Sequence, residues 1–554
     1  MSSAHPHRST NGVHFPRALA AVSAGLLLLA AIAAPARAAR SAKAPSAQEE
    51  VTRNFDKTLS LPAGHSFAIE HKFGEVKIHG ESGREVKIHA TIRVQLASRS
   101  EAESYANQIR IEVEQNGQGI QVRTVYPDKT WFSTSHRVSY SVDYDIALPS
   151  DSPVSVRNTF GNINVTSVSA KTDIDNKNGQ LTLRDSGPAK LTNSFGAIDL
   201  TNASGNSSIT NSNGSVNVSS VKGALEIRNR FGNITAHNIQ GPLAISGGNG
   251  PVDISDAAET TVSNSFGAVT ARSIRGNLTV NDNNGAIDVS NIQGHATLNG
   301  SFGAITFSNI SGNLACTATN SRIKGSSVAG NVAINTTFGE VSLDQLGGSA
   351  DVQDSNGNIT VHEAKGYAKL NTSFGSIEAS ALHKGARATT GNGRIHLSAI
   401  DGDTFTKTSF GAVAAQHIAG NLTVENSNGS VEASYIKGDV SAKTSFASVS
   451  IEETAGQISV DNQNGSVSIS AARSGSCKNI SAKTSFSSIQ VRLPENAGYS
   501  VTAHTSFGRI NTDLPITATG ELGGNSLTGK IGNASCSLSL SNANGNIEIL
   551  KLAK

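Results

Sequence analysis

The stretch that decides the fold lies at residues 194–218 and reads SFGAIDLTNASGNSSITNSNGSVNV. It contains a Ser-Phe-Gly motif at Phe195 and, 18 residues later, an Asn-Gly motif at Asn213. Three and five residues after Phe195 stand Ile198 and Leu200, with a polar residue between them. Such alternation is typical of a β-strand with one buried face. The stretch therefore predicts a strand-forming repeat with a period of about 18 residues.

The same two motifs alternate along most of the chain. Successive Phe positions are 35 or 36 residues apart, and each Asn lies 17 or 18 residues from its neighbouring Phe. Asn320 occupies the Asn position in an Asn-Ser variant. The repeat column consists of Phe160, Asn178, Phe195, Asn213, Phe231, Asn249, Phe266, Asn284, Phe302, Phe338, Asn356, Phe374, Asn392, Phe410, Asn428, Phe446 and Asn464. We refer to these Phe and Asn positions as the marks.

Each unit contains two strand-like segments joined by a corner. Eight residues after a mark lies a further apolar residue, such as Ile274, which is followed two residues later by Gly276. A second inward pair follows, as at Leu278 and Val280. The regular glycine indicates a corner that needs either a positive φ or a close backbone approach. Because one unit cannot form a core alone, the pattern predicts an all-β fold, a single-stranded parallel β-helix (solenoid) of about 20 rungs, right-handed by the usual crossover preference.

The marks themselves stand at one corner of each rung. The strand alternation continues to two residues before each Phe, so parity places the ring in the interior. A regular line of exposed Phe side chains would also favour aggregation. We therefore expect an internal packing column in which the alternate Asn side chains bond to turn amides. The other interpretation is an exposed Phe stripe that binds a partner.

The two ends of the chain differ from the repeat. Residues 1–38 have a basic flank, an apolar run and a small-residue cleavage site, which predicts a removed signal peptide. We expect a flexible lead at 39–50, an N-terminal cap with several strands and a short helix at 51–150, regular rungs at 151–492, and irregular C-terminal rungs with a cap at 493–554. No transmembrane segment is expected after cleavage, so the protein is expected in the periplasm, at the cell surface or outside the cell.

The chain has three cysteines, Cys316, Cys477 and Cys536. Cys316 falls on an inward repeat position and is expected to be a small core residue. Along the repeat, Cys477 and Cys536 are about three rungs apart, which corresponds to roughly 14 Å. Disulfides need Cα atoms closer than about 7 Å. We therefore expect no disulfide between these two cysteines.

Charge and residue patterns exclude several functions. The 45 Lys+Arg and 43 Asp+Glu leave a net charge of +2, so no basic surface for nucleic acid is indicated. Asp253 and Asp288 recur at one outward position but are two rungs apart, which does not suit the paired carboxylates of a glycosidase. His65, His71, His79 and His89 lie close together in the sequence, but His79 and His89 occupy outward positions of strand-like segments, which argues against a metal site. We expect no catalytic residue, metal or cofactor; the alternative is a carbohydrate-active enzyme, a polysaccharide lyase or glycosidase.

Large aromatic residues are concentrated in the predicted cap. Trp131, Tyr126 and Phe132 surround a hairpin tip and are candidate contacts to a sugar or protein ligand. The other interpretation of these residues is packing within the cap.

Several short motifs together resemble a known family. They are Phe73-Gly74-Glu75-Val76, Leu148-Pro149, the repeated Asn-Gly-x-Ile/Val rungs, Leu493-Pro494-Glu495-Asn496-Ala497 and Thr505-Ser506-Phe507-Gly508. In these the chain resembles the bacterial adhesin-like family with β-strand repeats labelled DUF4097. The resemblance implies a β-helical fold at the cell envelope or surface and implies no catalytic residues. We therefore expect an exported, non-catalytic, adhesin-like structural or interaction protein that presents a long polar surface to an envelope component, glycan or protein.

Overall fold

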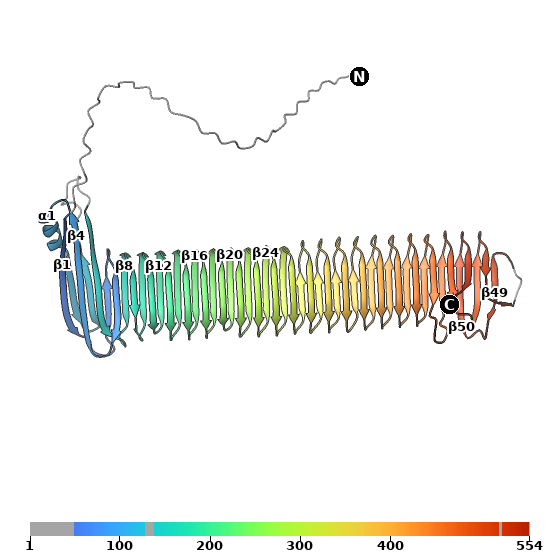
Figure 1. Cartoon of the computed structure of the whole chain (residues 1–554), viewed down its shortest axis with the longest axis horizontal. Coiled ribbons are helices and arrows are strands. Elements are labelled where there is room, and N and C mark those ends of the chain that lie inside the picture. Colours follow the sequence, from blue (N-terminus) through green and yellow to red (C-terminus); the bar gives the residue numbers. More distant parts are fainter. Residues whose placement is uncertain (1–48, 128–137, 520–522, 553–554) are drawn as a thin grey trace, which may run out of the picture. The chain divides into compact units, whose positions relative to one another are not determined.

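The structure, a computed structural model, describes residues 49–127, 138–519 and 523–552. The predicted signal peptide and nearly all of the predicted lead lie outside these residues. Within the described ranges, a pair of parallel sheets shares one core, and the chain passes from one sheet to the other in every regular coil (Figure 1). This confirms a parallel β-solenoid of about 19 turns with about 18 residues per turn. Its handedness stays a prediction.

A regular coil contains one strand in each sheet, as in β12 (Ala189–Phe195) and β13 (Ile198–Ala203). Each strand pairs in parallel with its equivalents 17 or 18 residues away. The regular coils extend from β8 (Val154–Phe160) to β43 (Val467–Ala471), which then pairs with β45 (Ile489–Leu493) across 22 residues. Each coil inside this stack lies between two others, so the backbone N–H and C=O groups of its strands are hydrogen-bonded on both sides.

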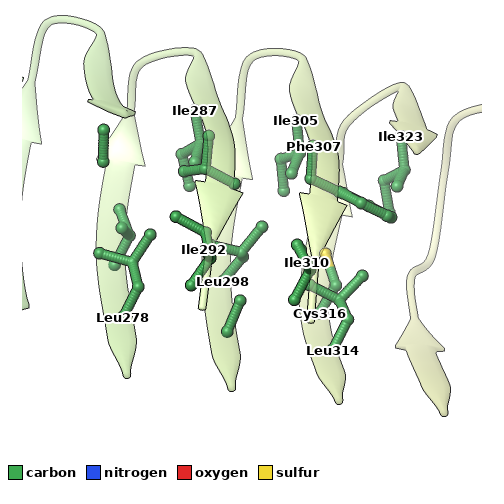
Figure 2. Close-up of a cluster of buried hydrophobic side chains, with 14 of the residues drawn as sticks. Leu278, Ile287, Ile292, Leu298, Ile305, Phe307, Ile310, Leu314, Cys316 and Ile323 are labelled. Carbon is green, nitrogen blue, oxygen red and sulfur yellow. The ribbon is translucent and has the colours of Figure 1, made fainter. Parts of the chain in front are cut away.

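Six positions of each regular coil face the interior. Three of them are the apolar positions that follow each mark, and Ile198, Leu200 and Ala203 are at most 1% exposed. Two more come from the preceding strand, and the sixth is polar and is described below. Figure 2 shows this stacking of Leu and Ile from coil to coil, with the buried Cys316 among them. Full burial of each Val, Leu or Ile contributes about 1.5–3 kcal/mol, so the core is held together by many equivalent contacts.

The corner between β13-type and β12-type strands contains a non-glycine residue with positive φ. It lies seven residues after the mark, as in Asn202 (φ 56°) and Asn291 (φ 58°). Ser, Asp and Asn, which tolerate this conformation, occupy the first ten such positions, and later coils have Gln, Glu, Ala, His or Tyr. Gly294, three residues beyond Asn291, lacks that φ, but a Cβ there would lie 2.6 Å from the Gly276 carbonyl oxygen. Close backbone approach is therefore the reason for the glycine predicted at this corner.

Antiparallel strands form the N-terminal region. β1 (Glu49–Ser60) pairs with β4 (Glu85–Leu96), which also pairs with β7 (Ser139–Pro149). The helix α1 (Arg99–Gln108) packs on β1 and β4, and Ser98 caps it by accepting a hydrogen bond from the Glu101 amide. None of the described residues forms a helix long and apolar enough to cross a membrane.

An early coil lies directly against the first regular coil. It consists of β2 (Ser66–Glu70) and β3 (Val76–Glu81), which pair with β8 and with β9 (Ile163–Thr166). On its other side, β2 pairs with β6 (Gly119–Val125), and β6 continues into an antiparallel pair with β5 (Arg110–Asn116). The change from parallel to antiparallel pairing covers the open end of the solenoid, as a repeat fold requires.

The C-terminal coils are stacked out of sequence order. β50 (Cys536–Asn542) pairs with β44 (Ile480–Thr484) on one side and with β46 (Tyr499–Thr505) on the other. In the opposite sheet β51 (Ile547–Lys551) likewise lies between β45 and β47 (Ile510–Thr512). The last coil of the chain is therefore inserted between two coils that precede it in sequence.

This insertion brings Cys477 and Cys536 together as a disulfide, with Cα atoms 6.0 Å apart at a sequence separation of 59. The prediction that they stay unpaired was wrong. It counted rungs along the sequence, whereas the strand that begins at Cys536 pairs directly with β44. Cys316 is confirmed as a buried thiol at an inward position.

β49 (Ser526–Ile531) pairs antiparallel with β46 beyond this coil.

Candidate functional site

A column of buried polar side chains lies behind the corner that contains the marks. Asn193, two residues before Phe195, donates from Nδ2 to the Gly179 carbonyl oxygen of the preceding coil at 2.9 Å and to that of Gly196 at 3.2 Å. The buried members are Asn158, Asn176, Asn193, Asn211, Asn229, Asn264, Asp282, Thr336, Asp354, Thr372, Thr390, Thr408, Asn426, Thr444, Asn462, Thr484, Thr505 and Asn542. We call this the inner polar column. The sequence signal for it was the recurring Asn or Thr two residues before each mark, which the sequence analysis missed.

The glycine that follows most of the marks lets the backbone turn around the inner polar column. Gly196 has a φ of 121°, and a Cβ on it would lie 2.2 Å from the Gly179 carbonyl oxygen. Because the chain reverses there, Ser194 and Phe195 both face away from the core while Asn193 faces into it. The corner of the interior is thus occupied by an amide side chain and leaves no space for a ring.

The Phe marks consequently form an exposed column, and the prediction that they pack inside was wrong. Their exposed fractions range from 41% at Phe231 to 84% at Phe507. The parity argument failed because strand alternation stops at the turn, where two consecutive side chains point outward. The exposed members are Phe160, Phe195, Phe231, Phe266, Phe302, Phe338, Phe374, Phe410, Phe446, Phe486 and Phe507. We call these eleven residues the Phe column.

The Asn marks lie in the gaps between the rings. The Nδ2 of Asn428 donates to the Ser409 carbonyl oxygen at 3.0 Å, and that of Asn464 donates to the Ser445 carbonyl oxygen at 3.1 Å. The side chains therefore bond to turn carbonyls, and the predicted bonds to turn amides were wrong. Each amide turns back toward the preceding coil, so the space between successive Phe rings is bordered by a short polar side chain.

The alternation of Phe and Asn holds in space even where it fails in the sequence. No Asn-Gly motif separates Phe486 from Phe507 along the chain. The inserted last coil places Asn544 between them, since its amide donates to the Ser485 carbonyl oxygen at 2.8 Å, and the Phe507 amide donates to the Ala543 carbonyl oxygen at 2.8 Å. The out-of-order stacking thus restores the sequence Phe, Asn, Phe on this corner.

At the N-terminal end of the corner, aromatic rings lie on neighbouring strands. The rings of Phe73 and Phe160 are stacked with centroids 5.4 Å apart and an interplanar angle of 3°, and Tyr126 contacts Phe73 edge-on at 5.4 Å. Tyr126, a candidate ligand contact, is half-buried, accepts a hydrogen bond from the Phe73 amide at 3.3 Å, and has its pKa raised by burial. This geometry supports packing as its role. Trp131 and Phe132 lie outside the described residues.

The outward carboxylates do not form an acid–base pair. Asp253 and Asp288 are joined by Arg272, whose nitrogens lie 3.9 and 3.2 Å from their oxygens. Among the described residues, no group of three or more His, Cys, Asp and Glu side chains could hold a metal ion. A hollow of about 560 Å³ lies beside the disulfide, and the residues that line it include neither a carboxylate nor a histidine. Neither place has the paired carboxylates of a glycosidase.

Residues 383–550 match the family model described as Toastrack DUF4097, whereas no curated protein matches the chain. Among solved structures, a candidate cell adhesion protein from Clostridium sporogenes is 8% identical with a TM-score of 0.14, covering 91% of this chain and 100% of that one. A candidate adhesin from Parabacteroides distasonis is 13% identical with a TM-score of 0.11, covering 68% and 97%. The family match confirms the resemblance seen in the sequence, over the C-terminal region of the solenoid.

Proposed function

We propose that this chain, which has a Toastrack DUF4097 match at residues 383–550, is an exported, non-catalytic, adhesin-like protein that binds a partner through the Phe column. The observation that carries this proposal is the exposure of eleven Phe side chains along one corner. Their exposed area is on the order of 1,000 Å². The largest apolar patch of a typical monomer is about 300–600 Å², and larger ones mark interaction sites.

The chemistry around the Phe column supports a binding role. Among the residues that directly precede the marks, most are Ser, Thr, Gly or Asn, and only Lys177 and Arg230 are charged. On this side, the apolar stripe is therefore bordered mostly by small uncharged side chains. Aromatic rings with a polar rim are the usual composition of the centre of a protein interface. The partner is an envelope component, a glycan or a protein.

Two features support export. The amino-terminal 38 residues have the composition of a cleaved signal peptide. The disulfide between Cys477 and Cys536 is the kind of bond that persists in oxidising compartments and is rare in the cytosol. Both features are consistent with a protein that works in the periplasm, on the cell surface or outside the cell.

The chain itself offers a matched substitution for testing the Phe column. Asn stands at the equivalent position of every second coil, so Phe-to-Asn changes convert one natural type of coil into the other. The column variant has three central changes, Phe266→Asn, Phe302→Asn and Phe338→Asn. The control variant places the same residue on the outward face of the other sheet, at Thr235→Asn, Thr270→Asn and Thr306→Asn.

The test measures binding of the purified full-length expression product to intact bacterial cells, envelope fractions and a glycan array. We expect the column variant to bind at least tenfold more weakly than the wild type. Burying three half-exposed rings against the partner contributes more than about 1.4 kcal/mol to the binding free energy, which corresponds to a tenfold change in affinity. The control variant should bind as the wild type does. Equal binding by the column variant and the wild type would refute a role for the Phe column.

A further inference from the structure

The Phe column has a regular spacing that its partner has to match. Phe and Asn marks pair in register on adjacent coils, as Phe195 does with Asn178 and Asn213. Adjacent strands lie about 4.8 Å apart, so successive Phe rings lie about 9.6 Å apart with one Asn coil between them. Two stacked rings lie about half this distance apart, so the gap between two successive Phe rings has room for one more ring.

Rings on adjacent strands of this solenoid do stack. Where two Phe marks are direct neighbours, Phe73 and Phe160, their rings are parallel with centroids 5.4 Å apart. On another corner, His417 and Tyr435 from adjacent coils stack with centroids 4.8 Å apart. A ring placed at the height of an Asn mark would thus stack on the Phe above it and on the Phe below it.

We propose that the partner of the Phe column is the Phe column of a second copy of this chain, with the rings of each copy entering the Asn gaps of the other. This inference rests on the proposed function, that the Phe column is a binding surface, and it names the occupant. Two copies have the same spacing by construction, so the match extends along the whole column. The resulting interface is a ladder of alternating rings from both copies, about 4.8 Å apart.

Other regular occupants lose register with the column. An extended strand presents side chains of one face about every 6.8 Å. A helix presents one heptad position about every 10.5 Å and drifts from the column by about 0.9 Å in each repeat. Either would meet only a few of the eleven rings before its side chains faced the wrong positions. A second copy meets all of them.

Symmetry decides how the two copies are oriented. With a two-fold axis parallel to the stack, rings of both copies would lie at equal heights and oppose each other. With a two-fold axis perpendicular to the stack, the copies run antiparallel and can be offset by one coil, so that each Phe faces an Asn. The interface is then isologous, the commonest arrangement in homodimers.

The area and the charge of the column fit this dimer. The exposed Phe area of one copy, on the order of 1,000 Å², reaches the approximately 800 Å² per partner of a standard interface. An isologous face meets itself, so a strongly charged one would repel its copy. Only Lys177 and Arg230 are charged among the residues that directly precede the marks. Farther from the rings, charges of both signs flank the column, as in the ion pairs Arg322–Glu340 and Lys407–Glu425.

The test measures the dissociation constant of self-association by sedimentation velocity on the full-length expression product, with circular dichroism as the check of folding. We expect a reversible dimer. The column variant defined above should weaken self-association at least tenfold, because each substitution removes a ring from both copies. A gap variant fills the spaces with rings of the same chain, at Asn284→Phe, Asn320→Phe and Asn356→Phe.

The gap variant distinguishes interdigitation from general stickiness. If the rings interdigitate, filling the gaps blocks entry and weakens the dimer, although the variant has three more exposed rings. A matched control adds the same rings to the outward face of the other sheet, at Thr235→Phe, Thr270→Phe and Thr306→Phe, and should not weaken the dimer. Stronger association of the gap variant than of the wild type would overturn the proposal, as would a wild type that stays monomeric at every concentration.

The failure of this inference can be separated from failure of the proposed function. A monomeric wild type that still binds cells or glycans in a Phe-dependent way would leave the binding surface in place and replace the second copy by another partner. A monomeric wild type whose binding is unaffected in the column variant would overturn both. If a triple variant fails to fold, the single changes Phe302→Asn and Asn284→Phe provide the same comparison in smaller steps.

Discussion

Two buried aspartates, Asp282 and Asp354, occupy positions of the inner polar column where most other coils have Asn or Thr. Replacing them tests how much this column contributes to stability. Asn264, one coil before Asp282, donates from Nδ2 to the Gly267 carbonyl oxygen at 2.8 Å. An ionised carboxylate has no proton to donate at the equivalent position. Asp282 is 2% exposed and neither of its carboxyl oxygens has a well-aligned hydrogen-bond partner, because the nearby Asn283 and Asn284 amides offset its burial only in part. One oxygen of Asp354 also has no partner. Burial raises the pKa of both carboxyl groups above their usual value.

The direction of the pH effect follows from these raised pKa values. In the folded chain the protonated form is favoured, so the stabilising contribution of each group is fully present below its unfolded pKa of about 3.9. It is lost as the pH rises through the folded pKa. At pH 8 both aspartates therefore lower the free energy of unfolding. The changes Asp282→Asn and Asp354→Asn supply a neutral donor and should each raise that free energy by about 1–3 kcal/mol.

The assay is urea denaturation followed by circular dichroism at pH 8 and at pH 3.5. Because a repeat protein can unfold one region at a time, amide hydrogen exchange at residues 280–284 should report the gain locally. At pH 3.5 the variants and the wild type should differ little, since the protonated carboxyl group can also donate. Asp461→Asn, at an exposed position beside the inner polar column, serves as the control and should change little. No gain at pH 8, or an equal gain at both pH values, would refute the reasoning.

Three further outcomes are expected. Burial raises the pKa of the Cys316 thiol to about 12, so a maleimide should label it only after the chain is unfolded, as mass spectrometry would show. A Cβ at Gly325 would lie within 2.0 Å of the Phe307 ring, so Gly325→Ala should lower the free energy of unfolding by about 1–3 kcal/mol in denaturation. Phe307→Leu should restore part of this loss; a double variant whose loss equals the sum of the two single losses would contradict the contact. Cys536→Ser removes the bond to Cys477, at a sequence separation of 59, and should destabilise the C-terminal coils by up to about 4 kcal/mol. Hydrogen exchange should become faster in β50 and in its partners β44 and β46; unchanged exchange would contradict this stabilisation.

The exposure of the Phe column depends on features that no short-range sequence pattern contains. The Phe marks continue the parity of the strand, and only the turn at the following glycine directs them outward. That turn depends on bonds between coils, such as the one from Asn193 to the Gly179 carbonyl oxygen. The recurring Asn or Thr two residues before the marks is visible in the sequence, but the bond that it makes to the preceding coil exists only once the coils are stacked.

The repeat could be predicted from the sequence. The 18-residue period, the inward positions represented by Ile198 and Leu200, and the burial of Cys316 are local, because alternation within a strand decides which side chains can share a core. The family resemblance likewise required only short motifs.

The arrangement of the corners and of the two ends, in contrast, depends on contacts between coils. The chain's last coil pairs between β44 and β46, so Cys477 meets Cys536 and Asn544 separates Phe486 from Phe507. Identical repeats have equivalent edges, and a strand with the right pattern can pair with any of them. The sequence therefore leaves the order of stacking open, and contacts between distant coils select it.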